Sequence, residues 1–340
     1  MRIQPFDPQT ATDTEWDALH RLNVQSEREY HPDDPPPPRE DLELSWRNEP
    51  PSLSAHRWGV WDGDTMIGRG GIWIWTEETN QHIAFFHLYV LPGYRRQGLG
   101  KQLLARVVDP ARRANRTLLH SGTTNRVPDG EGFLSHIGAQ PALQSRESRL
   151  LVADVDRAQL TEWQRQAQAK AAGFALELVH GAYPERDLPG ICRVFDALND
   201  APRGDLDMED WRHTPERLRE WHASNVKRGF DRWTIFARDL ATGTIAGWTE
   251  VLYNPRRPSL LMQLGTGVLP EYRGLNLGRW MKAAMLEKVL RDMPQVTYIR
   301  TGNAVANAPM LNINIELGFK LYQIETTWQI PTDKVAAYVG

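Results

Sequence analysis

The chain has 340 residues, of which 41% are hydrophobic and 24% are charged, and its formal net charge is −3. This composition is typical of a globular protein, and the length leads us to expect two domains of ordinary size. The weak charge gives no basic field for nucleic acid, and the single cysteine, Cys192, excludes an internal disulfide and a multi-cysteine zinc site.

The chain begins with MRIQPFDPQTATD, which lacks the apolar segment of a secretory signal. No run of apolar residues is long enough to cross a bilayer. We therefore expect a cytoplasmic protein that binds neither membrane nor nucleic acid, and the oligomeric state stays open.

The first half predicts a series of elements that ends in a strand, a glycine-rich loop and a helix. The stretch DDPPPP (33–38) is expected to be an extended surface loop, because proline breaks helices and central strands. Residues 56–75 predict a hairpin around Asp62, Gly63 and Asp64, and residues 82–91 predict a buried strand. The loop YRRQGLG (94–100) leads into a helix with Leu99, Leu103 and Val107 on one face.

The second half repeats this order 178 residues later. Residues 90–100 (VLPGYRRQGLG) and 268–278 (VLPEYRGLNLG) agree at seven of eleven positions. A predicted hairpin (232–253) and a buried strand (259–269) precede the second loop, and a helical face of Leu277, Met281, Met285 and Val289 follows it. The polar, helix-prone stretch 153–173 lies between the halves, so we expect an N-terminal domain (1–155), a linker helix (156–173) and a C-terminal domain (174–340).

A buried strand, a tight loop and a helix start bring free backbone N–H groups together and favour phosphate binding. Gly98 and Gly100 would allow close approach of a phosphate, and Arg95 and Arg96 would add charge; the alternative is a surface turn with solvated arginines. The dinucleotide fingerprint requires glycine where Leu103 stands. The P-loop motif requires glycine at Arg95 and Ser or Thr at Gln102. The loop at 94–100 is therefore neither a dinucleotide-binding fingerprint nor a P-loop.

The remaining pattern, Arg95-x-x-Gly98-x-Gly100 after V-x-P-x-Y-R, resembles the loop of the GNAT acyltransferase family, which holds the pyrophosphate of acetyl-coenzyme A. NAPMLNINIELGF (307–319) resembles the family's N-x-x-A-x-x-L-Y-x-x-x-G-F helix. The resemblance covers nearly the whole chain as two copies, and the C-terminal half is similar to bacterial tandem GNAT proteins of the sort that includes mycothiol synthase.

The resemblance implies an α/β fold with two tandem GNAT-like domains, each a mixed, mostly antiparallel sheet flanked by helices. It also implies an N-acyltransferase that uses acetyl-coenzyme A as acyl donor and a small amine as acceptor, without a metal. The implied cofactor contacts in the first copy are Val90, Arg95, Arg96, Gln97, Gly98, Leu99 and Gly100. Those in the second copy are Val268, Arg273, Gly274, Leu275, Asn276, Leu277, Gly278 and Asn307.

Departures from the family pattern bear on which half catalyses. Asn276 replaces a motif glycine, but asparagine tolerates the left-handed conformation. Pro128, Gly130 and Gly132 disfavour a long helix in the N-terminal half, where the pantetheine arm would run in the family. We therefore expect catalysis in the C-terminal half. The alternatives are catalysis in the N-terminal half and a non-catalytic acyl-coenzyme A-binding module.

The tyrosine that acts as acid in the family is replaced by Asn314 in the C-terminal half and, at about the same position, by Leu134 in the N-terminal half. Asn314 could still donate a hydrogen bond to the departing sulfur. Glu250 is the first candidate for the base, with an exposed strand carboxylate as the alternative. His87 could reach a cleft or be a satisfied buried histidine.

The acceptor side and the oxyanion contact are expected in the C-terminal half as well. The family implies oxyanion stabilisation by a backbone N–H near Gly267 and Val268. Residues 196–210 carry six acids against one arginine and precede Trp211 and Trp221, a combination that would suit a cationic amine. The alternative for this segment is a set of helix caps on a solvated loop, and Glu271 is expected to face solvent.

Overall fold

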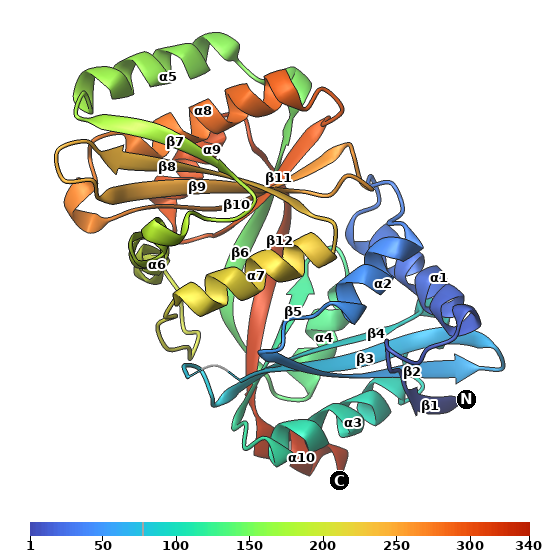
Figure 1. Cartoon of the computed structure of the whole chain (residues 1–340). Coiled ribbons are helices and arrows are strands. Elements are labelled where there is room, and N and C mark those ends of the chain that lie inside the picture. The colour runs from blue at the N-terminus through green and yellow to red at the C-terminus, as the bar shows by residue number, and fades with distance from the viewer. Residues whose placement is uncertain (77) are drawn as a thin grey trace. The chain divides into compact units, whose positions relative to one another are not determined.

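The computed structural model describes residues 1–76 and 78–340, which form two compact units (Figure 1). The N-terminal unit consists of residues 1–144, 203–209 and 323–340. The C-terminal unit consists of residues 145–202 and 210–322. Each unit is an α/β structure built on one mixed, mostly antiparallel sheet, as the sequence predicted.

The sheet of the N-terminal unit has the strand order β1-β2-β3-β4-β5-β12. Its β4 and β5 are parallel, and the other neighbours are antiparallel. The turn between β2 and β3 falls at Gly63 and Asp64, where the hairpin was predicted. The strands are β1 (Arg2–Pro5), β2 (Leu53–Asp62), β3 (Thr65–Trp75), β4 (Ile83–Val90), β5 (Leu118–Thr124) and β12 (Lys320–Pro331).

The described part of this unit also has five α-helices. A capping box of Thr12 and Glu15 starts α1, because each residue's side chain bonds the other's backbone N–H. The helix α3 begins at Leu99 after the glycine-rich loop, and α10 packs against it. The helices are α1 (Asp13–Tyr30), α2 (Arg39–Arg47), α3 (Leu99–Arg113), α4 (Pro128–His136) and α10 (Thr332–Val339).

The C-terminal unit repeats this plan with the strand order β7-β8-β9-β10-β11-β6. Here β10 and β11 are the parallel pair. The strands are β6 (Gln140–Leu151), β7 (Phe174–His180), β8 (Asp231–Asp239), β9 (Ile245–Tyr253), β10 (Leu260–Val268) and β11 (Tyr298–Ala304). The helices are α5 (Arg157–Lys170), α6 (Leu188–Asp196), α7 (Pro215–Lys227), α8 (Leu277–Asp292) and α9 (Ala308–Glu316).

Each sheet takes its sixth strand from the other half of the chain. In the N-terminal unit β12 pairs with β5, and in the C-terminal unit β6 pairs with β11. The units therefore differ from the expected division at residues 155 and 174. The helix α5 also differs from the expected linker, because its Leu160, Trp163 and Ala167 are buried in the core of the C-terminal unit.

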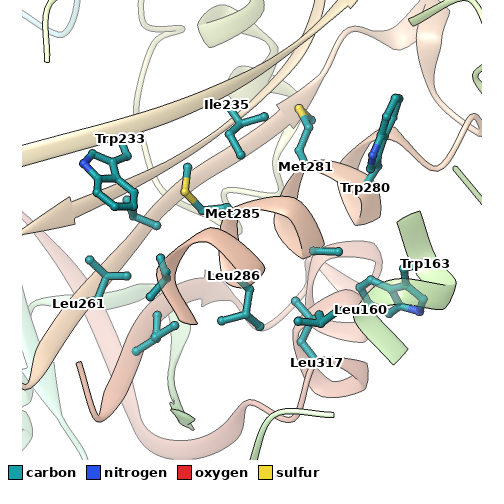
Figure 2. Packing of buried hydrophobic residues seen from close by; sticks show 14 of the residues in the cluster. Leu160, Trp163, Trp233, Ile235, Leu261, Trp280, Met281, Met285, Leu286 and Leu317 are labelled. Atoms are coloured by element: carbon teal, nitrogen blue, oxygen red, sulfur yellow. The ribbon is translucent and has the colours of Figure 1, made fainter. Parts of the chain in front are cut away.

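Burial of apolar side chains between α8 and the sheet forms the main core of the C-terminal unit (Figure 2). Trp280, Met281 and Met285 of α8 pack there with Ile235 of β8, and α5 covers the other side of α8 with Trp163. In the N-terminal unit, Val107 of α3 and Val335 of α10 are fully buried in one cluster. These apolar contacts fix α3 and α8, and hence the loops before them.

Within the described part of the chain, no helix combines the length and the apolar character that crossing a membrane requires.

Candidate functional site

Each sheet opens at its parallel pair of strands. In the N-terminal unit β4 pairs with β5 only through residues 83–85, although β4 continues to Val90 and stays paired with β3. In the C-terminal unit β10 pairs with β11 only through residues 260–262. Past these points the strands diverge, and the main-chain N–H and C=O groups on the inner edges of the opening are released from the ladder.

The loops that follow β4 and β10 have the same backbone shape. Each contains two left-handed residues, Arg96 (φ 61°) and Gly98 (φ 79°) in the first, and Gly274 (φ 84°) and Asn276 (φ 62°) in the second. The first left-handed position is Arg96 in one loop and Gly274 in the other, and the second is Gly98 in one loop and Asn276 in the other. Asn276 thus keeps the turn intact, because asparagine adopts this conformation more readily than most residues.

Each loop delivers the start of a helix to the opening. The first helical turns, from Leu99 and from Leu277, have backbone N–H groups without partners inside the helix. A Cβ atom added at Gly98 would lie no closer than 3.9 Å to any atom beyond the neighbouring residues, so there is open space next to this position. Both helix starts can therefore receive an anion.

A cavity of about 320 Å³ lies over the first loop. Among the predicted contacts, those that line it are Val90, Arg95, Arg96, Gly98, Leu99 and Gly100. Gln97 is exposed and does not line this cavity. Lys101, His136 and Tyr338 contribute as well, with the Lys101 ammonium 5.1 Å from the centre of the Tyr338 ring.

A second cavity of about 660 Å³ lies over the second loop. The predicted contacts that line it are Val268, Arg273, Gly274, Asn276, Leu277, Gly278 and Asn307. Leu275 packs against the core instead. The side chain of Asn307 accepts a hydrogen bond from the N–H of Met310 and so caps α9.

The two cavities differ in charge. The first is lined by Arg95, Arg96 and Lys101 against one carboxylate, Asp129. In the second, Arg273 is paired with Asp200 and Arg279 with Glu316. The first cavity therefore has an excess of positive charge. In the second cavity the positive and negative charges of the lining residues cancel.

Arg95 and Arg273 have a structural role that the sequence did not indicate. The Nε–H of Arg95 donates to the carbonyl of Val90, and that of Arg273 donates to the carbonyl of Val268, so each arginine holds the end of its own strand. Arg95 also pairs with Glu29 and Asp129. Arg96 is exposed and makes no hydrogen bond or ion pair among the described residues, so it is the arginine that is available to a phosphate.

The helix behind the first cavity is intact. We expected Pro128, Gly130 and Gly132 to disfavour it, but α4 spans the nine residues Pro128–His136 and α9 also has nine. Pro128 stands in the first turn, where its missing N–H costs nothing. The expectation of a spoiled N-terminal helix was wrong, and with it the main reason for doubting the N-terminal site.

Glu250 and Asn314 lie away from the second cavity. Glu250 is buried on β9 and accepts hydrogen bonds from Tyr183 and Thr234, with the Nε of Arg232 at 3.7 Å. Burial raises the pKa of Glu250, and Arg232 and the hydrogen bonds oppose this shift. Asn314 is also buried, and its amide donates to Oδ1 of Asn303 at 2.6 Å. Neither side chain lines the cavity over the second loop.

The first part of the acidic segment lines the second cavity through Asp200 and its neighbours, and the later part is engaged elsewhere. In the N-terminal unit, Glu209 accepts a hydrogen bond from the N–H of Asn80 at 2.7 Å, and Asp207 lies 3.2 Å from His82. The guanidinium of Arg217 makes cation–π contacts with the rings of Trp211 and Trp221, at 4.9 and 4.6 Å from their centres. Glu271 pairs with Arg193.

Three polar side chains of the N-terminal unit meet near the open end of β4. Arg69 of β3, His87 of β4 and Tyr30 of α1 make no hydrogen bond to the described residues, and Nε of Arg69 is buried. The rings of Tyr30 and His87 lie 6.5 Å apart, and Tyr30 also lines the first cavity. Burial, with the charge of Arg69, lowers the pKa of His87 to about 3, and burial raises the pKa of Tyr30.

The corresponding surface of the C-terminal unit is apolar. Gly68 pairs with Val90 and Gly247 pairs with Val268, so Trp248 occupies the position of Arg69. Trp248 is 4% exposed and its ring centre lies 4.1 Å from that of Phe195. A Cβ atom at Gly265 would lie 2.3 Å from the Trp248 ring, and one at Gly267 would lie 3.0 Å from it. Trp248 thus covers the strand where β10 opens.

Sequence reasoning left out Tyr30, Arg69, Lys101 and Tyr338. One signal was present, because Arg69 is the only charged residue in the strand TMIGRGGIWIW. Tyr338 stands beside Lys101 only because the C-terminal helix packs on α3, a contact between opposite ends of the chain.

Comparison with known proteins supports this description. The acetyltransferase (GNAT) family matches residues 16–127. A tandem GNAT protein from the clavulanic acid biosynthesis pathway has 24% identity and a TM-score of 0.78, over 97% of this chain and 98% of that one. A GCN5-related N-acetyltransferase from Sphaerobacter thermophilus has 12% identity and a TM-score of 0.64, over 97% and 95%.

A glucosamine N-acetyltransferase region of a fungal multi-domain GH3 β-N-acetylglucosaminidase has 12% identity and a TM-score of 0.66, over 97% of this chain and 38% of that one. The comparison with curated proteins finds no match. At these identities the solved structures establish the fold. Members of the GNAT family are N-acetyltransferases that take the acyl group from acyl-coenzyme A. Residues 16–127 thus match the GNAT acetyltransferase family, and the whole chain has the fold of a tandem GNAT protein.

Proposed function

We propose that this GNAT enzyme transfers an acyl group from acyl-coenzyme A to a small amine and that the reaction takes place in the N-terminal unit. The observation that carries the proposal is the first cavity, where an open helix start and uncompensated positive charge occur together. A coenzyme A molecule has a diphosphate and a further phosphate, and a helix start with positive charge nearby favours the binding of these groups.

The residues of the first cavity fit this group. The N–H groups at the start of α3 would hold the diphosphate, with Arg96 beside them. Lys101 and Tyr338 would bind the more distant nucleotide part, because they combine an aromatic face with an ammonium that makes no ion pair among the described residues. The opening between β4 and β5 leaves main-chain groups to orient the acyl arm.

When bound, acyl-coenzyme A supplies a thioester, and an amine nitrogen forms the new C–N bond as the C–S bond breaks and the thiolate leaves. The amine loses one proton and the thiolate takes one up, so the overall reaction is balanced. Tyr30 lines the cavity at the open end of β4, and its raised pKa keeps the hydroxyl protonated. Tyr30 therefore takes the role of proton donor that we first considered for Asn314.

The C-terminal unit is the second candidate for the catalytic unit. The larger cavity favours it, as does a register shift on β10 between Gln263 and Thr266, since such bulges occur next to active sites. Against it stand the paired charges of its cavity and the apolar cover of Trp248. In this proposal the C-terminal unit retains the phosphate-binding loop without the acceptor side.

The test compares Gly100→Glu with Gly278→Glu, which place a carboxylate at the same point of the two loops. Thiol release from acetyl-coenzyme A would be measured with a panel of primary amines, and acetyl-coenzyme A binding by calorimetry. We expect Gly100→Glu to abolish turnover and Gly278→Glu to leave it within a fewfold of the wild type. Loss of turnover only in Gly278→Glu would assign catalysis to the C-terminal unit. Binding without turnover for every amine would indicate a non-catalytic module.

A further inference from the structure

The unpartnered side chains beside β4 have the features of a ligand site. Arg69 and Tyr89 are paired in the ladder between β3 and β4, and the ring of Tyr30 lies 6.3 Å from that of Tyr89. Arg69 makes no hydrogen bond or ion pair with the described residues, although its charge influences both Tyr30 and His87. Arg69 and His87 each keep part of their surface accessible.

A guanidinium in this position is costly without an anion. Arginine has five N–H donors, and a desolvated donor without an acceptor costs free energy. The ring of Trp46, 5.9 Å from the guanidinium carbon, is an aromatic contact and not an acceptor in the plane of the N–H groups. An anion that bound Arg69 would satisfy these donors.

The neighbouring charged groups are occupied with other partners. Oε2 of Glu27 lies 3.2 Å from Nδ1 of His31, and Arg57 is paired with Glu49. Glu29 accepts a hydrogen bond from Tyr89 at 2.6 Å and pairs with Arg95. Because the carboxylates of Glu27 and Glu29 lie around the cluster, a singly charged planar carboxylate suits it better than a phosphate dianion.

We propose that Arg69 binds a carboxylate of the acceptor, so that the substrate of the N-terminal unit carries both an amine and a carboxylate, as an amino acid does. The proposal rests on the proposed function of this unit. The imidazole of His87, on the open strand β4, accepts a hydrogen bond from the amine and directs its nitrogen toward the cavity. The C-terminal unit has Trp248 in place of Arg69 and therefore lacks this specificity.

Matched acceptors test the proposal. Thiol release from acetyl-coenzyme A would be compared for glycine, phenylalanine and β-alanine, for their carboxamides, and for phenethylamine. We expect kcat/KM for the acids to exceed that for the matched amides by roughly tenfold to a hundredfold, the worth of a charged hydrogen bond. Arg69→Met should remove this preference by raising KM for the acids, and Arg69→Lys should restore part of it. Arg113→Met, at an exposed arginine of α3, serves as the control.

A binding readout separates this proposal from the proposed function. N-acetylglycine, a product-like carboxylate, would be titrated into the full chain with coenzyme A present and followed by calorimetry. We expect Arg69→Met to weaken this binding by roughly tenfold or more and to leave the affinity for acetyl-coenzyme A unchanged. Arg69-dependent binding without turnover would support the carboxylate site and count against the proposed function.

Two results would overturn the carboxylate site while the proposed function stood. One is equal use of the acids and their amides by the wild type. The other is equal weakening of N-acetylglycine binding in Arg69→Met and Arg113→Met. A thermal melt tests for misfolding, because removal of a partly buried charge without a partner among the described residues should keep or raise the melting temperature of Arg69→Met.

Discussion

Lys282 offers a quantitative test of the electrostatics of the C-terminal unit. It stands in α8 and is 3% exposed, with no hydrogen bond or ion pair among the described residues. Its ammonium lies 5.7 Å from the centre of the Phe319 ring, among apolar side chains that include Val251 and Leu261. Burial lowers the pKa of Lys282 from 10.5 to about 7.

This shift sets the size and the sign of the effect. A difference between 10.5 in the unfolded chain and about 7 in the folded one corresponds to on the order of 5 kcal/mol. Between these pH values the unfolded state binds more protons, so stability rises with pH and flattens below about pH 7. Lys282→Met keeps the chain length of the side chain and removes the charge.

The assay is urea unfolding followed by tryptophan fluorescence at pH 7 and pH 9. We expect Lys282→Met to be more stable than the wild type at pH 7, and this advantage to shrink by roughly 3 kcal/mol at pH 9. Lys288→Met is the control on the same helix, since Lys288 is partly exposed and pairs with Asp292. Parallel pH profiles for the wild type and Lys282→Met, or a less stable variant at pH 7, would refute the reasoning.

Two further predictions concern the N-terminal unit. Arg95→Met should lower the melting temperature, because Arg95 joins Glu29, Asp129 and the carbonyl of Val90, whereas Arg96→Met should leave it unchanged and weaken acetyl-coenzyme A binding severalfold. Thermal melts and calorimetry distinguish these effects, and the opposite assignment would contradict the roles given to the two arginines. Tyr338→Ser should weaken acetyl-coenzyme A binding in calorimetry, because the ring lines the first cavity beside Lys101. An unchanged affinity would place the nucleotide elsewhere.

Local pattern was sufficient to predict much of the fold. The hairpins, the buried strands before the loops and the helices after them depend on turn residues and on periodicity within short windows, and they occur where expected. The exchange of β6 and β12 was missed because it depends on pairing between strands far apart in sequence. The domain boundary at residue 155 failed for the same reason.

The site residues show a similar division between local and distant information. The loop positions were predicted because strand, turn and helix start are contiguous in sequence. The charge balance of the second cavity was not predicted, because Arg273 and Arg279 pair with Asp200 and Glu316, which are distant in sequence. Glu250 was chosen from its strand alone, and no sequence pattern indicated that Tyr183 and Thr234 would enclose it.

The two loops show how a repeat can keep its backbone and change its chemistry. Each loop requires two left-handed residues, and the non-glycine one is Arg96 in the first and Asn276 in the second. A side chain at the first of these positions brings a positive charge to the cavity, and Gly274 at the same position brings none. The pair Arg69 and Trp248 differs in the same direction on the other side of the opened strand. Both changes leave positive charge to the N-terminal unit, where the proposed function uses it to bind a diphosphate and an anionic acceptor.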